Sequence, residues 1–196
     1  MIKNICVFCS SSDALPEIYY TEAKKFARLL ISENYNLIYG GARVGSMGII
    51  ARMMMEGNAH VTGVVPELIY NNNIAESNLS SLIITPDMKS RKAKMADLAD
   101  AFIALPGGFG TLEELLEVIT LKQLEYHQKP VVMINTNGFY DKLADFFEQL
   151  YSDNFAKSDY KMLYHIASDS FSAIQYLKEY TPGKVVSKWY KANLNI

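Results

Sequence analysis

Two kinds of chemically useful residues meet in one short stretch, residues 106–114, which reads Pro-Gly-Gly-Phe-Gly-Thr-Leu-Glu-Glu. Its three glycines within four positions allow positive φ and leave no Cβ to keep a ligand from the backbone. A helix that begins here offers free N–H groups and the positive end of its dipole, which suit a phosphate. Glu113, Glu114 and Glu117 follow at once. Anion binding does not need these carboxylates, so they indicate chemistry beside the phosphate.

Carboxylates are the usual groups for cleaving a bond at an anomeric carbon. They act as nucleophile, as general base on water, or as electrostatic partner of an oxocarbenium-like centre. A carboxylate beside a phosphate anchor suits a nucleoside monophosphate, in which the phosphate holds the ribose and Glu114 faces C1′. The sequence has no Gly-x-Ser-x-Gly elbow of a serine hydrolase, and the spacing of His60, His127 and His165 predicts no metal site.

A purely structural interpretation of the same stretch is open at this point. Thr111 and Glu114 stand in the Thr-x-x-Glu relation of a capping box, in which both side chains only satisfy backbone donors at the helix start. On these residues alone, the structural and the catalytic interpretations have equal weight.

A second glycine-rich stretch, residues 40–48, reads Gly-Gly-Ala-Arg-Val-Gly-Ser-Met-Gly and also joins a predicted strand to a predicted helix. It has neither the Gly-x-Gly-x-x-Gly order of dinucleotide folds nor the Gly-Lys-Ser/Thr ending of a P-loop. We therefore expect a nucleoside monophosphate or a sugar phosphate rather than NAD or a triphosphate with magnesium. The alternative is a glycine turn that serves only close packing of helix on strand.

Alternating apolar and amphipathic stretches predict the elements that position these residues. Strands are predicted at residues 5–9, 37–39, 61–65, 82–85, 101–105, 131–135 and 162–167, and helices at 16–34, 49–56, 87–97, 112–127, 138–151 and 171–180. The alternation is typical of an α/β fold with a Rossmann-like, doubly wound, mostly parallel sheet and helices on both faces. Ligands in such sheets gather at the carboxyl ends of strands, where both glycine turns and the polar turn at 10–13 lie.

The predicted helix before the central strand carries Lys89, Arg91, Lys92 and Lys94. A basic run of this kind is usually a solvated helix face. Its position supports a second hypothesis, in which Arg91 or Lys92 points to the site and binds phosphate or ribose oxygens, or counters the charge of a catalytic carboxylate. The polar residues 71–81 are the best candidate for a loop over the site.

Length and composition limit the function classes. The 196 residues fit a single nucleotide-binding catalytic domain at 1–181, with a tail at 182–196 whose conformation the sequence does not predict. A net charge of −2 does not indicate the basic surface that non-specific binding of nucleic acid requires. No stretch has the length of a membrane span and no signal-peptide pattern is present, so we expect a cytoplasmic protein. Cys6 and Cys9 are interpreted as reduced core thiols, since residues three apart on a strand face opposite ways.

Several of these segments resemble the Lonely Guy family. The resemblance rests on residues 88–92, Met-Lys-Ser-Arg-Lys, on the stretch 106–114, and on its continuation Leu-Leu-Glu-Val-Ile-Thr, and it extends from Cys9 to Asp141. Members of that family are cytokinin riboside 5′-monophosphate phosphoribohydrolases and were often labelled lysine decarboxylases. The resemblance implies hydrolysis of the N-glycosidic bond of an N6-substituted AMP, or of AMP itself, to a free base and ribose 5-phosphate.

The resemblance also implies roles for individual residues. Arg91 and Glu114 occupy the family's catalytic positions, with Glu114 as nucleophile or base. Together with positions in the glycine turns, the expected substrate-binding residues are Ser10, Gly41, Gly45, Met88, Lys92, Gly107, Gly108, Phe109, Gly110, Thr111, Leu112, Glu113 and Thr120. No metal or organic cofactor is implied. The family assembles at least as dimers with the pocket near the interface, so a homodimer or higher homo-oligomer is expected.

The Arg91-Lys92 pair and Thr120 favour the catalytic interpretation, because a capping box gives no reason for them. Gly107, Gly108, Gly110 and Thr111 are then expected to hold phosphate while Glu114 faces the sugar and also caps its helix.

Two differences from the family stand out. Ala42 and Ser46 replace the more usual Gly and Leu, and Asn73 lies where many plant members carry a Glu that contacts the substrate, which bears on base preference. Two other functions stay open: a non-catalytic nucleotide-binding or carrier protein, and an amino-acid decarboxylase. The latter needs pyridoxal phosphate, and no residue independently indicates a lysine that would hold it.

Overall fold

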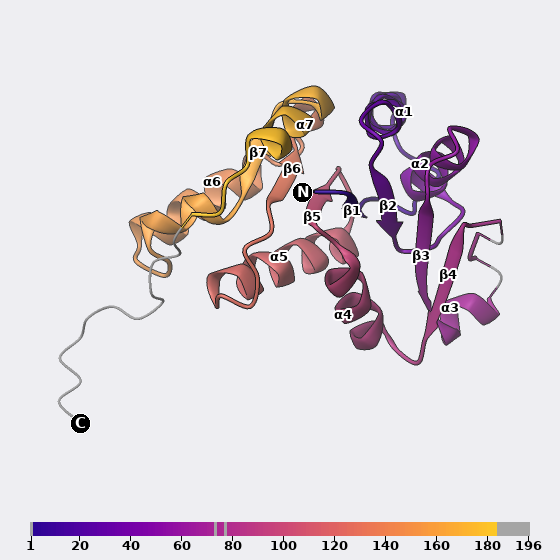
Figure 1. Cartoon of the computed structure of the whole chain (residues 1–196). Coiled ribbons are helices and arrows are strands. Elements are labelled where there is room, and N and C mark those ends of the chain that lie inside the picture. The colour runs from indigo at the N-terminus through magenta and orange to yellow at the C-terminus, as the bar shows by residue number, and fades with distance from the viewer. Residues whose placement is uncertain (1, 73, 77, 184–196) are drawn as a thin grey trace.

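The computed structural model describes residues 2–72, 74–76 and 78–183, and its core is one seven-stranded sheet (Figure 1). The strands are β1 (Asn4–Phe8), β2 (Asn36–Tyr39), β3 (Val61–Pro66), β4 (Ser81–Thr85), β5 (Ala101–Ala104), β6 (Val131–Ile134) and β7 (His165–Ala167). Their order is β4-β3-β2-β1-β5-β6-β7, and every pair of neighbours is parallel. The predicted Rossmann-like α/β fold is confirmed.

Helices cover both faces of the sheet (Figure 1). They are α1 (Glu17–Ser32), α2 (Gly45–Glu56), α3 (Glu67–Asn71), α4 (Met88–Leu98), α5 (Phe109–Gln123), α6 (Asp141–Ser152) and α7 (Ser170–Glu179), with 3-10 turns at Thr136–Gly138 and Ser158–Leu163. Buried hydrophobic side chains of α1, α2 and α7 belong to a first core, and those of α4, α5 and α6 to a second. The two cores are separated by the sheet.

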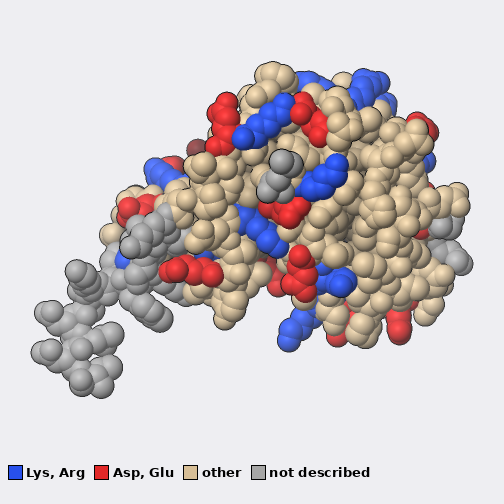
Figure 2. Space-filling model, viewed as in Figure 1, with Lys and Arg blue, Asp and Glu red and all other residues tan. Residues whose placement is uncertain are grey.

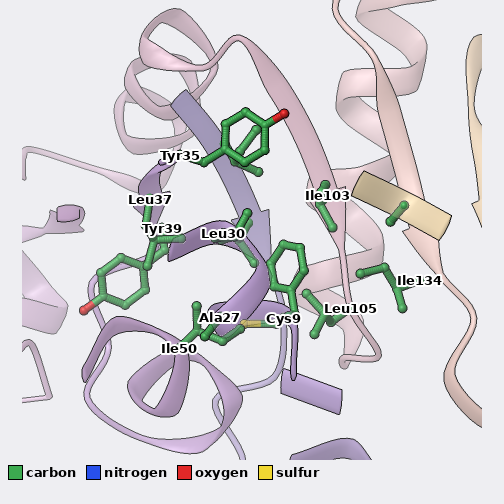
Figure 3. Close-up of a cluster of buried hydrophobic side chains, with 14 of the residues drawn as sticks. Cys9, Ala27, Leu30, Tyr35, Leu37, Tyr39, Ile50, Ile103, Leu105 and Ile134 are labelled. Atoms are coloured by element: carbon green, nitrogen blue, oxygen red, sulfur yellow. The ribbon is translucent and has the colours of Figure 1, made fainter. Parts of the chain in front are cut away.

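The side chains of β1 alternate between the two cores, as the pleat of a strand requires. Ile5 and Val7 join the first core, whereas Cys6 joins the second. Figure 3 shows part of the first core, in which Cys9 lies near Ala27 and Leu105. Cys6 and Cys9 are therefore free, buried thiols on opposite faces, as predicted.

Two helix boundaries differ clearly from the predicted ones. α2 begins at Gly45, earlier than predicted, because Val44 is extended and already acts as its N-cap. α5 ends at Gln123 instead of continuing to residue 127, because Glu125 takes a left-handed φ of 65° and its N–H turns back to the Lys122 carbonyl.

Two further differences concern segments that the sequence patterns left as loops or assigned to a strand. α3 was not predicted, although its N-cap Pro66 has a suitable fixed φ. The last strand begins only at His165, since the 3-10 turn Ser158–Leu163 occupies part of the predicted range.

On the face shown in Figure 2, basic and acidic side chains are interspersed. Among the described residues, no helix is both long and apolar enough to cross a membrane.

The strand order reverses between β1 and β5, which pair directly with each other. From β1 the chain proceeds outward through β2, β3 and β4, and from β5 it proceeds the other way through β6 and β7. In open α/β sheets, ligands bind beyond the carboxyl ends of the strands at such a switch point. Both glycine turns and the loop after β1 are located there.

Candidate active site

A cavity of about 510 Å³ opens at the switch point. Its lining comes from the loop after β1, from the glycine turn at residues 40–48 (the first glycine turn in chain order), from the segment around α3, from α4 and from the start of α5. The lining residues are Cys9, Ser10, Ser11, Ser12, Gly40, Ala42, Met47, Ile69, Ile74, Met88, Arg91, Gly108, Phe109, Gly110, Thr111 and Glu114. Its size is within the range of small-molecule sites. A larger hollow of about 670 Å³ lies at the amino-terminal ends of the strands, and none of the expected site residues lines it.

Arg91 and Glu114 form a buried ion pair at this cavity. Nη1 of Arg91 lies 2.7 Å from Oε1 of Glu114, and the side chains are only 6% and 7% exposed. Nε of Arg91 donates to the Val64 carbonyl at 3.0 Å. Gly40 closes the other side, because a Cβ there would lie 2.2 Å from Nη2. The guanidinium is thus fixed by contacts from β3, the first glycine turn and α5.

The environment of Glu114 perturbs its ionisation. Burial raises the pKa of its carboxyl above the ordinary value, while the charge and the hydrogen bond of Arg91 oppose that rise without cancelling it. A buried carboxyl with a raised pKa, lining a cavity beside one fixed cation, is typical of a group that takes part in chemistry.

Glu114 does not cap α5. The N-cap is Gly108, and no side chain accepts a hydrogen bond from the helix start. Thr111 is buried against Gly107, where a Cβ would lie 2.1 Å from Thr111 Oγ1. The capping-box interpretation is therefore wrong, and so is the expectation that Glu114 also caps its helix. The reason is that Arg91, from another helix, takes the carboxylate.

The first turn of α5 presents its backbone donors to the cavity. Within the described part of the chain, the N–H groups of Phe109, Gly110 and Thr111 have no hydrogen-bond acceptor, whereas Leu112 N–H donates to Gly108 in the normal helical way. A Cβ at Gly108 or Gly110 would meet no heavy atom within 4 Å. This helix start has both the donors and the space that an anion needs.

The first glycine turn is filled by the protein itself. Gly41 has a φ of +76°, and a Cβ there would lie 2.1 Å from Val65 Cγ2. Gly45, with a φ of +61°, packs on the loop after β1, where a Cβ would lie 2.6 Å from the Ser10 carbonyl oxygen. Asp13 Oδ1 accepts the Gly45 N–H at 2.7 Å. These contacts fit the alternative in which the turn serves close packing.

The cavity therefore gathers part of the expected set of residues. Its lining includes Ser10, Met88, Arg91, Gly108, Phe109, Gly110, Thr111 and Glu114, and it does not include Gly41, Gly45, Lys92, Gly107, Leu112, Glu113 or Thr120. Lys92 forms ion pairs with Glu113 and, at 2.8 Å, with Glu117. Thr120 donates to the Leu116 carbonyl on a different side of α5.

Ile69 and Ile74 line the cavity but were missed from the sequence. The segment that carries Ile74 is held over the first glycine turn, because Ile74 O accepts the Arg43 N–H and Ala75 forms a bridge with Ala42. The only available signal was an apolar residue within a polar stretch that was expected to cover the site. Asn73, whose identity bears on base preference, lies outside the described residues.

No three His, Cys, Asp or Glu side chains of the described residues are grouped so that they could hold a metal ion.

Solved structures share this fold. A molybdenum cofactor binding protein from Rippkaea orientalis is similar with a TM-score of 0.69 and 20% identity, over 91% of this chain and 96% of that one. A Moco carrier protein from Chlamydomonas reinhardtii is similar with a TM-score of 0.68 and 22% identity, over 91% and 97% of the two chains. At these identities the similarity shows the fold alone.

Similarity in sequence identifies the family as well as the fold. The family model described as "possible lysine decarboxylase" matches residues 47–177. A cytokinin riboside 5′-monophosphate phosphoribohydrolase of Arabidopsis thaliana is 41% identical over 92% of this chain and 84% of its own length. A probable enzyme of the same name from Oryza sativa subsp. japonica is 40% identical over 95% and 77% of the two chains. The chain thus belongs to the Lonely Guy family, to which the motifs around Arg91 and Glu114 pointed.

Proposed function

We propose that the protein is a phosphoribohydrolase that cleaves the N-glycosidic bond of adenosine 5′-monophosphates, either N6-substituted cytokinin nucleotides or AMP. The products are a free base and ribose 5-phosphate. One observation carries the proposal: the cavity combines an anion-ready helix start at Phe109–Thr111 with the buried carboxyl of Glu114 and its partner Arg91. The names of the similar plant enzymes support the same reaction.

The substrate phosphate is assigned to the start of α5. The N–H groups of Phe109, Gly110 and Thr111 supply donors, the helix dipole adds a positive potential, and the missing side chains of Gly108 and Gly110 leave room. Ser10 lines the same cavity from the loop after β1. Fixing the phosphate places the ribose next to Glu114, so the reacting carbon is oriented by binding energy from a remote group.

Glu114 is assigned to C1′. As the bond between C1′ and the base nitrogen breaks, its electron pair leaves with the base, and positive charge develops on the ribose. The Glu114 carboxylate either bonds to C1′, to be displaced by water later, or takes a proton from water as the water attacks. Arg91 orients the carboxylate and keeps enough of it ionised to act, since its charge opposes the effect of burial on the pKa of Glu114.

The test is direct. Purified protein is incubated with isopentenyladenosine monophosphate and with AMP in the presence of a chelator, and free base is measured by chromatography. Release of base from either substrate is expected. Absence of base from both contradicts the enzyme function. A non-catalytic nucleotide-binding or carrier protein would instead show nucleotide-dependent thermal stabilisation without product.

We infer in addition that residues 1–181 act as one catalytic unit and that the protein works as a homodimer or higher homo-oligomer. The inference rests on family membership, which is why it needs its own measurement. Light scattering of the purified protein at assay concentration gives the oligomeric state, and a monomer that retains full activity contradicts the second part.

A further inference from the structure

We propose that Asp13 restricts the site to nucleotides that carry a single phosphate. The proposal rests on the proposed function only in placing the first phosphate at the start of α5. It assigns a specificity role to the carboxylate that fills the neighbouring helix start, that of α2, which would otherwise receive a second phosphate.

The two helix starts flank the carboxyl end of β1. α2 follows β2 and α5 follows β5, and β1 lies between these two strands in the sheet. The loop after β1 therefore runs between them, and its residues Ser10, Ser11 and Ser12 line the cavity. A phosphate chain that begins at α5 and continues along this loop is directed to the start of α2.

Two N–H groups at the start of α2 already have acceptors within the protein. Asp13 Oδ1 accepts the N–H of Gly45, the first residue of α2, at 2.7 Å. The Met47 N–H is directed to the Ser10 carbonyl at 3.3 Å. A carboxylate at a helix start has the same electrostatic role as a bound phosphate, so it competes with one for the same donors.

The loop holds Asp13 in place. Ser10 Oγ accepts the Ser12 N–H at 3.0 Å, and Ser12 Oγ accepts the Ala14 N–H at 3.2 Å. Tyr20 OH donates to the Ser12 carbonyl at 3.2 Å and accepts the Leu15 N–H at 3.1 Å. Moving Asp13 aside for a second phosphate would break part of this set, and leaving it there opposes two negative charges.

The expected consequence is discrimination between mono- and diphosphates. A single phosphate at α5 does not need the donors of α2. A second phosphate on that side meets the Asp13 carboxylate, and the Gly45 and Met47 N–H groups already have acceptors within the protein. ADP is therefore expected to bind at least about tenfold more weakly than AMP, the size expected from one like-charge contact at a partly exposed site.

The test compares AMP and ADP binding by calorimetry in a Glu114→Gln background, where turnover of AMP is expected to be strongly reduced. Asp13→Asn keeps the side-chain oxygen that accepts from Gly45 but removes the charge. We expect this variant to lower the ratio of the ADP dissociation constant to that of AMP by roughly five- to tenfold, through tighter ADP binding. Asp13→Ala, which also frees the Gly45 N–H, is expected to lower the ratio at least as much.

The matched control is Asp169→Asn. Asp169 caps α7 in a similar way, with Oδ1 accepting the Ser172 N–H at 2.8 Å, but it lies at the β7 edge of the sheet. This variant loses the same kind of charge and is expected to leave the ratio unchanged.

An unchanged ratio in both Asp13 variants, or an equal change in Asp169→Asn, overturns the role of Asp13, and so does failure of both nucleotides to bind. The proposed hydrolysis fails separately, if AMP and ADP bind with the expected ratio but wild-type protein releases no base.

Discussion

The two glycine-rich turns at the switch point differ in what occupies them. Both follow a buried strand and lead into a helix. In the turn after β2, the glycines pack on Val65 and on the loop after β1, and Asp13 takes the Gly45 N–H. In the turn after β5, Gly108 and Gly110 face open space and the first helical donors are unpaired among the described residues.

Glycine content therefore does not distinguish a turn that binds a ligand from a turn that packs against the protein itself. Glycine is required in both, in one because another part of the chain comes close and in the other to leave room for a ligand. The distinguishing feature is whether the donors of the following helix already have acceptors. Only the turn after β5 combines free donors with a buried ion pair, Arg91 and Glu114, beside it.

The largest expected effect follows from removing the charge of Glu114. Glu114→Gln keeps the volume and an oxygen that can accept from Arg91, so the protein is expected to stay folded. It should lose turnover by at least about a hundredfold, because the acid–base or nucleophilic group is gone. Base release from AMP measures the loss. Glu117→Gln, one helical turn further and paired with Lys92, is the control. Retained activity in Glu114→Gln would return that residue to a structural role.

A substitution in the glycine turn after β2, which packs against other parts of the protein, should lower the stability of the fold. Gly45→Ala places a methyl group at a φ of +61° and against backbone atoms of the loop after β1 about 2.6 Å away. A loss of about 2 kcal/mol or more in the free energy of unfolding is expected, from the left-handed conformation and the overlap together. Urea denaturation followed by circular dichroism provides the measurement. Unchanged stability would mean that this glycine is not needed for packing.

A substitution in the glycine turn after β5, where the phosphate is expected to bind, should instead weaken substrate binding. Gly110→Ala meets no heavy atom within 4 Å, and alanine is favoured over glycine in a helix, so stability should be unchanged or slightly higher. The methyl group occupies the space assigned to phosphate, and KM for AMP is expected to rise roughly tenfold. Melting temperature and steady-state kinetics on the same preparation separate the two. If Gly110→Ala is destabilised but has a normal KM, the turn after β5 serves packing and not phosphate binding.

The smallest expected effect is a shift in pH dependence. Burial raises the pKa of Glu114 and Arg91 opposes the rise, so the acid limb of kcat should have its midpoint above the ordinary glutamate value. Arg91→Met removes the opposing charge and should move that midpoint to higher pH, whereas Arg91→Lys should move it less. The profile of kcat against pH is the measurement. A midpoint that does not move in Arg91→Met contradicts the electrostatic coupling.

The raised pKa of Glu114 should also affect how the free energy of unfolding depends on pH. A carboxyl whose pKa is raised on folding binds its proton more readily in the folded state. Its stabilising contribution is therefore present below the unfolded pKa and is lost as pH rises through the folded pKa. In Glu114→Gln this part of the pH dependence of unfolding should be absent.

The sheet could be predicted because each of its central strands is recognisable from its own short run of residues. β5 and β6 are continuous apolar runs that are buried along their whole length, as expected of parallel strands covered on both faces. Their alternation with amphipathic helices leaves few topologies, so it could be predicted that both glycine turns and the turn at 10–13 lie at the carboxyl ends of parallel strands.

The arrangement within the site was less predictable. Arg91 and Glu114 are 23 residues apart on different helices, and their contact depends on Gly40 and the Val64 carbonyl. The capping-box prediction failed because a local motif contains no information on a competing partner from elsewhere. The orientation of Thr120 and Leu112 away from the cavity likewise depends on how α5 docks on the sheet.

The most direct test of the account is a crystal structure of the Glu114→Gln variant with AMP bound. We predict that phosphate oxygens lie about 3 Å from the N–H groups of Phe109, Gly110 and Thr111. C1′ should face the side chain at position 114, and the start of α2 should remain occupied by Asp13. A phosphate bound over Gly41 and Gly45, with no phosphate at the start of α5, would contradict this assignment.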